Sequence, residues 1–84
     1  MENNPDQLLC HLDKIHTTPM GVQRIKRNLA LGEDTDAVAW CIQQIQAAVH
    51  IERRGKNWYA HTGTAVITVN ASSYTIITAH KKGV

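Results

Sequence analysis

The chain has 84 residues, a formal net charge of +2 at pH 7 and 43% hydrophobic residues, which suits one small globular domain over residues 1–84. The mild positive charge permits a nucleic-acid partner without requiring one. No apolar run approaches the roughly 20 residues that a membrane span needs, so we expect no membrane partner. The polar, acidic beginning of the sequence does not resemble a secretory signal, and we therefore expect a cytoplasmic location.

Three helices are predicted in the first half of the chain. The pairs Asn4-Pro5 and Thr18-Pro19 each place a capping side chain before a proline at the first helical position. Apolar residues recur at helical spacing after both pairs, and again after Asp34. This pattern predicts helices over about residues 5–16, 19–30 and 35–48.

After Val49 the apolar pattern changes from helical spacing to alternation. The segments VHIER, NWYAHT, TAVITVN and SYTIITAH are rich in β-branched and aromatic residues. Short breaks that contain glycine or serine separate them and suit tight hairpins. We therefore predict a four-stranded antiparallel meander over about residues 49–80. Together with the three helices this gives an α+β fold whose helices pack on one face of the sheet.

The alternation assigns a buried face and an open face to the predicted sheet. With two-residue turns, Ile51 pairs with Trp58, and Ile67 pairs with Ile76. A slip by one residue would mix apolar and polar side chains on both faces, which favours this register. In this register His80 points toward the helices. The open face carries His50, Glu52, Asn57, Tyr59, His61, Val66, Thr68, Asn70, Ser73, Thr75 and Ile77.

Titratable side chains gather on and beside the open face. RNA cleavage through attack of a 2′-hydroxyl needs a general base, a general acid and a cation near the phosphate. Histidine or glutamate can serve as the base, and histidine as the acid near neutral pH. A solvated surface accounts for the same side chains, because any small basic domain with five histidines offers them. The catalytic candidates are His80, His61, Glu52 and Arg54.

Cations and one aromatic ring offer contacts to a nucleic acid. A tyrosine can stack on a base while neighbouring cations contact the backbone, and a basic helix face can contact phosphates. Threonine's preference for strands explains a hydroxyl-rich face without any ligand. We expect no metal site and no cofactor, because the chain has no CxxC, HExxH or glycine-rich phosphate loop. The nucleic-acid-binding candidates are Arg24, Arg27, Arg54, Lys56, Tyr59, Lys81 and Lys82.

Three segments carry a resemblance to a known family. HTTPMGVQRIKRNL, RRGKNWY and ITVNASSYTIITAHK are, in combination, similar to the small prokaryotic family called domain of unknown function 3781. That resemblance implies a fold rather than an activity. Helices followed by an antiparallel meander, with a histidine near the C-terminus, are also similar in architecture to the barnase and RelE-like ribonucleases, which include toxin RNases. This second similarity implies a metal-independent endoribonuclease that uses His80, Lys81 and Arg54, together with Glu52 or His61.

Two functions from different classes are consistent with the sequence. The first is an RNA-binding or RNA-cleaving domain, of the kind found in toxin–antitoxin pairs. The second is a non-catalytic module that forms a homodimer or binds a protein through the open face, where Tyr59, Val66 and Ile77 lie among hydroxyls, or through an edge strand. RNA binding should weaken steeply with salt, whereas an apolar dimer should be nearly insensitive to it.

Overall fold

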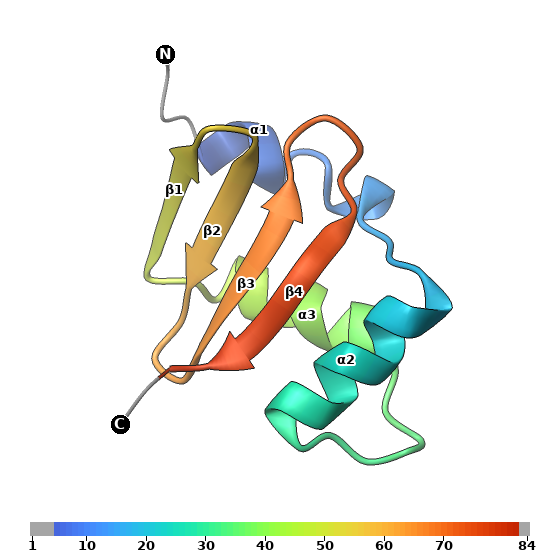
Figure 1. Ribbon diagram of the computed structural model, residues 1–84. Helices are drawn as coiled ribbons and strands as arrows, with labels where there is room; N and C mark the ends of the chain where they lie inside the picture. Colours follow the sequence, from blue (N-terminus) through green and yellow to red (C-terminus); the bar gives the residue numbers. More distant parts are fainter. Residues whose placement is uncertain (1–4, 83–84) are drawn as a thin grey trace.

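The computed structural model describes residues 5–82 and has an α+β fold (Figure 1). Short helices come first, and the four strands follow as an antiparallel meander in the order β1-β2-β3-β4. The predicted fold class and strand count are therefore confirmed. The elements are α1 (Pro5–Leu9), the 3-10 turn η1 (Leu12–Lys14), α2 (Pro19–Leu29), α3 (Ala37–Gln46), β1 (His50–Arg54), β2 (Asn57–His61), β3 (Ala65–Asn70) and β4 (Ile76–Lys81).

The first helix is much shorter than the predicted range of 5–16. After α1 and η1 the chain becomes extended and forms a parallel bridge between His16 and Thr75. The His16 N–H donates to the carbonyl of Tyr74 over 3.2 Å, and the Ile76 N–H donates to the carbonyl of His16 over 2.8 Å. This pairing with a segment 59 residues away in sequence replaces the helix that the apolar spacing predicts.

The second and third helices lie close to their predicted ranges and have clear caps. The Thr18 side chain accepts a hydrogen bond from the Gly21 N–H over 3.0 Å, at the start of α2. Ala30, with φ 56°, ends that helix in the left-handed conformation that glycine usually supplies. The Asp36 side chain caps α3 by accepting from the Ala39 N–H over 3.1 Å.

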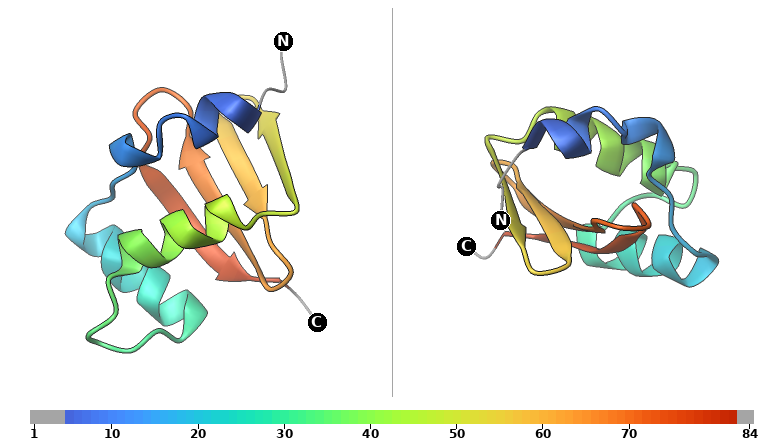
Figure 2. Two further views of the ribbon diagram at one scale, coloured as in Figure 1. Left: turned by 180° about the vertical axis from the view of Figure 1, so that it is seen from behind. Right: turned by 90° about the horizontal axis from the view of Figure 1, so that it is seen from above.

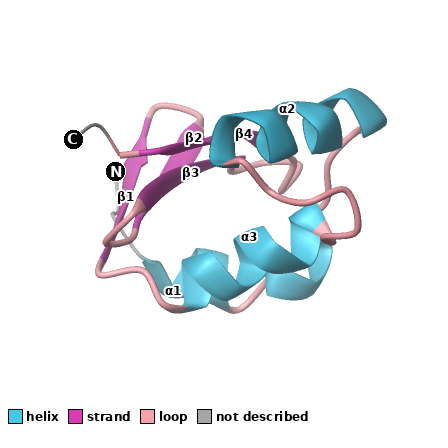
Figure 3. Ribbon diagram, turned by 90° about the horizontal axis from the view of Figure 1, so that it is seen from below, coloured by secondary structure: helices cyan, strands magenta, loops and turns pink. Residues whose placement is uncertain are grey.

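The helices do not all pack on one face of the sheet, which corrects that part of the prediction. Helices α1 and α3 cover one face, whereas α2 lies beside β4 at the edge of the sheet (Figures 2 and 3). Side chains from this region bind outward carbonyls of β4. Thr17 Oγ1 donates to the carbonyl of Ile76 over 3.1 Å, and Asn28 Nδ2 donates to that of Ala79 over 3.2 Å. The edge of β4 is thereby covered, while β1 forms the other edge.

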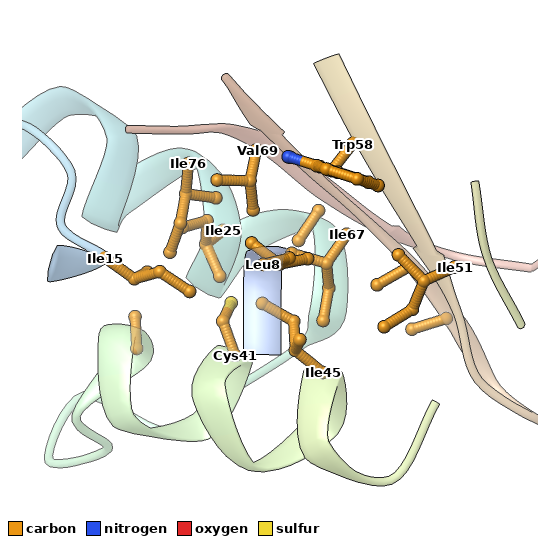
Figure 4. Packing of buried hydrophobic residues seen from close by; sticks show 14 of the residues in the cluster. Leu8, Ile15, Ile25, Cys41, Ile45, Ile51, Trp58, Ile67, Val69 and Ile76 are labelled. Carbon is orange, nitrogen blue, oxygen red and sulfur yellow. The ribbon is translucent and has the colours of Figure 1, made fainter. Parts of the chain in front are cut away.

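The hydrophobic core lies between the sheet and the helices (Figure 4). Trp58 is the largest of its fully buried side chains. Burying a side chain of this size stabilises the fold by several kcal/mol, so truncating it would cost about 3–5 kcal/mol. Burial also raises the pKa of the Cys41 thiol to about 12, which keeps that cysteine protonated. The other fully buried large side chains are Leu8, Ile25, Ile45, Ile67, Val69 and Cys41.

The strand register differs from the predicted one by two residues, which leaves the faces of β1, β2 and β3 as predicted. Ile51 lies opposite Ala60 rather than opposite Trp58, which pairs with Val69. The first hairpin turns at Gly55, which has φ +56°, and at the residue after it. Because side chains alternate with a period of two, a shift of two residues exchanges partners without exchanging faces.

A β-bulge in β4 overturns the predicted orientation of His80. Val69 pairs with Ile76, but Thr68 pairs with Thr78, so Ile77 is an extra residue in the strand. The alternation reverses beyond this point. Ala79 is fully buried, whereas His80 lies opposite Val66 on the open face. A regular strand would instead have directed His80 toward the core, where an imidazole would lose its hydration.

We expect Ala30→Gly to raise the free energy of unfolding by about 0.5–1 kcal/mol, because glycine tolerates positive φ without steric cost. Urea denaturation of the two proteins measures the difference. The matched control is Ala39→Gly on the exposed side of α3, which should lower the free energy of unfolding by about 0.5–1 kcal/mol. Equal destabilisation by both substitutions would contradict the assignment of Ala30 as a left-handed cap.

Candidate functional site on the open face of the sheet

The face of the sheet opposite α1 and α3 carries three rows of cross-strand partners, and Figure 1 looks onto it. We call these residues the open face. Each row runs across the strands, so its members lie side by side on one surface. The first row is His50, His61, Val66 and His80, the second is Glu52, Tyr59, Thr68 and Thr78, and the third is Arg54, Asn57 and Asn70.

Three charged or titratable residues of β1 and β2 form a hydrogen-bonded cluster. His61 Nε2 lies 3.0 Å from Glu52 Oε2. Arg54 Nη2 donates to the same oxygen over 3.2 Å, and its Nε donates to Oε1 over 3.4 Å. The hydrogen bond from His61, followed by that from Arg54, lowers the pKa of the Glu52 carboxyl below its ordinary value. Glu52 is therefore ionised at neutral pH and holds both neighbours in place.

The ionised carboxylate also decides which nitrogen of His61 carries the proton. A carboxylate can only accept hydrogen bonds, so the neutral ring donates from Nε2–H to Glu52. The lone pair of Nδ1 then remains available for a proton or a metal ion. His50 lies directly opposite on β1, with its ring centroid 5.6 Å from that of His61 and the two planes tilted by 33°.

The ring of Tyr59 is in contact with the guanidinium group of Arg54. The Cζ atom of Arg54 lies 5.6 Å from the centre of the Tyr59 ring. This distance is within the range of a cation–π contact, which holds the guanidinium plane near the aromatic ring. A nucleic-acid base would therefore meet the Arg54–Tyr59 pair rather than the aromatic ring alone.

The remaining catalytic candidate, His80, joins the same row through the bulge. Its side chain is exposed and, within residues 5–82, makes no hydrogen bond or ion pair. One strand separates it from His61, so the two Cα atoms are about 10 Å apart at the usual strand spacing. Arg54 is not close to this end of the face, because it lies two rows away. The structure thus brings together Glu52, His61 and Arg54, whereas His80 shares only the first row with His61 and is separated from it by one strand.

The predicted basic residues fall on separate surfaces. Lys56 is exposed in the turn after β1, and Lys82 is exposed just beyond the far end of β4. Lys81 is also exposed, but it pairs with the buried Ala65 and therefore points to the side of the sheet opposite the open face. Arg24 and Arg27 lie on α2 instead, where they line a shallow depression together with Met20 and Gln23. These two arginines are not part of the open face.

The sequence-based candidates omit His50. Its alternation with Glu52 already assigned it to the open face, but the predicted register placed it away from His61. The two-residue shift in pairing brings the rings together. Within the described part of the chain, no group of three or more His, Cys, Asp or Glu side chains is arranged to hold a metal ion.

The sequence matches, over residues 9–80, the family described as "Protein of unknown function (DUF3781)". The match covers most of the chain, which therefore belongs to this family. No curated protein and no solved structure shows significant similarity to the chain. The expected similarity to the barnase and RelE-like ribonucleases is thus not confirmed. Among residues 5–82, no helix is both long and apolar enough to cross a membrane.

Replacing His61 by alanine should raise the pKa of Glu52 toward its ordinary value, because the hydrogen bond from His61 is the main cause of the depression. A pH titration of the Glu52 side-chain carboxyl carbon by NMR measures this change. The control variant Arg24→Ala, on α2, should leave the titration unaltered. An unchanged pKa in His61→Ala would show that the carboxylate and the imidazole do not interact in solution.

The same depression has a consequence for stability at acid pH. Glu52 contributes to stability above the pKa of the unfolded chain, about 4.3 for a free glutamate. That contribution is lost as the pH falls through the lower pKa of the folded protein.

Proposed function

We propose that this protein binds RNA on the open face of its sheet. The observation that carries the proposal is the charge pattern of that face. Glu52 is the only acidic residue after Asp36, and both His61 and Arg54 bind it, so it presents little free negative charge. Cations stand at both ends of the strands, with Lys56 beside the Arg54–Glu52 pair at one end and Lys82 just beyond the other. This arrangement suits a ligand that carries several negative charges.

The shape and composition of the face favour RNA over a compact anion. A four-stranded sheet is broad, and its two cationic ends are separated by the length of the strands, about 15 Å. A single-stranded segment can place successive phosphates across such a distance. Its bases can stack on the guanidinium plane of Arg54 or beside Tyr59. The partly exposed side chains of Thr78 and Asn57 can bind base edges or 2′-hydroxyls.

RNA cleavage is a more specific form of this proposal, and the histidines of the first row of the open face support it. His61 Nδ1 can remove the proton from a 2′-hydroxyl, whose oxygen then attacks phosphorus while the bond from phosphorus to O5′ breaks. His80, in its protonated form, can donate its proton to the departing O5′. Glu52 would orient His61 and keep its proton on Nε2, as a carboxylate does beside a catalytic imidazole.

RNA binding should weaken with salt, with a slope of log K against log salt of about −2 to −3 if three or four phosphates are contacted. Fluorescence anisotropy with a labelled single-stranded RNA, in the presence of EDTA, measures this slope. Arg54→Ala and Lys56→Ala should each weaken binding several-fold, whereas the matched variant Arg24→Ala on α2 should bind within twofold of the wild type. Equal losses in all three variants would place the ligand elsewhere.

The cleavage form of the proposal needs its own measurement. With EDTA present, wild-type protein should convert RNA to fragments that end in 2′,3′-cyclic phosphate, and His61→Ala or His80→Ala should lose this activity while keeping wild-type circular dichroism. Intact RNA together with salt-dependent binding would leave a binding protein without catalysis. Intact RNA and no binding, with salt-insensitive self-association instead, would favour the non-catalytic interaction module.

A further inference from the structure

We propose that His50 and His61 together bind one divalent transition-metal ion that prefers imidazole ligands, such as Zn²⁺, and that Glu52 positions His61 for this purpose. The inference does not depend on RNA binding. It rests on the cross-strand pairing of His50 with His61 and on the hydrogen bond from His61 to Glu52. The absence of a metal-binding motif in the sequence does not exclude such a site, because its two ligands come from different strands.

The distance between the two imidazole rings fits a shared ion. A Zn–N bond of about 2.0–2.1 Å puts each ring centroid about 3.2 Å from the ion, so the centroids of two imidazoles on one ion lie about 5–6 Å apart. The observed separation of 5.6 Å is within that range. His50 and His61 are direct cross-strand partners, so the sheet itself holds the rings at this spacing.

The hydrogen bond to Glu52 leaves His61 in the form that a metal requires. Its Nε2–H donates to the carboxylate, and Nδ1 keeps a lone pair. Histidine ligands commonly donate their second ring N–H to a carboxylate, which fixes the ring and increases its basicity. Arg54 in turn holds Glu52 through two hydrogen bonds. The carboxylate–histidine part of a carboxylate–histidine–metal site is therefore already in place without an ion.

The protein supplies two ligands, and the rest of the coordination sphere is open. Within residues 5–82 no third His, Cys, Asp or Glu completes the site. His50 is exposed, so water or an external ligand can take the remaining positions. Two nitrogen ligands favour Zn²⁺, Cu²⁺ or Ni²⁺ over Mg²⁺ and Ca²⁺, which require oxygen ligands.

Calorimetric titration with Zn²⁺ alone, without RNA, tests the proposal. The full chain carrying Cys10→Ser is used, because the exposed thiol of Cys10 would otherwise offer a competing ligand. We expect one saturable site per chain that EDTA empties and a hundredfold excess of Mg²⁺ does not. His50→Ala and His61→Ala should each weaken binding at least tenfold. The matched variant His80→Ala, on the same row but beyond Val66, should bind within twofold.

The role of Glu52 is tested separately by Glu52→Gln, which keeps an oxygen acceptor for His61 but removes the charge. Loss of an outer-shell partner weakens metal binding by about 10–100-fold, and we expect the lower end of this range. The NMR signals of the His50 and His61 rings should still shift on addition of Zn²⁺. No saturable binding, unchanged affinity in His50→Ala, or an equal loss in His80→Ala would overturn the proposal. None of these outcomes bears on RNA binding, which is measured in EDTA.

Discussion

The fold is governed by one constraint, which is that the sheet buries only one of its faces. Helices α1 and α3 cover that face, and α2 is used at the edge of β4 instead. All fully buried apolar side chains of the sheet, such as Trp58 and Ile67, point to the covered face. The alternation of strand side chains then requires the opposite residues to meet solvent or a ligand. The imidazoles and the carboxylate of β1 and β2 lie on the open face for this reason, whereas Arg53 lies on the other side against Trp58.

His61 links the two ligands that we propose for the open face, and it cannot serve both at once. As a general base His61 needs a free lone pair on Nδ1, whereas a bound metal ion would occupy that lone pair. The Glu52 carboxylate can accept the hydrogen bond from Nε2–H whether Nδ1 of His61 is free or occupied. The cluster is therefore suited to hold His61 in one orientation while the occupant of Nδ1 changes. Proton and metal ion would compete for the same lone pair.

The sequence predicts the helices, the strands and the faces of the sheet better than it predicts how neighbouring segments pair. The change from helical spacing to alternation at Val49 is a local pattern, and the error in register left the faces intact because it was two residues. The sequence around the bulge at Ile77 contains no glycine or proline that would indicate an irregular strand. The orientation of His80 therefore could not be inferred from the sequence. The loss of helix near His16 depends on pairing with a distant segment, which no local pattern records. The grouping of His50 with His61 depended on register in the same way.

The composition of β1 bears on whether the sheet acts through its edge or its face. This strand is the uncovered edge, and four of its five residues, in the sequence HIERR, carry charged or titratable side chains. Charged side chains are one of the means by which proteins discourage an edge strand from pairing with a second chain. The cover that Thr17 and Asn28 give to β4 protects the opposite edge in another way. Because one edge strand is charged and the other is covered, the open face is the surface of the sheet that remains for a ligand.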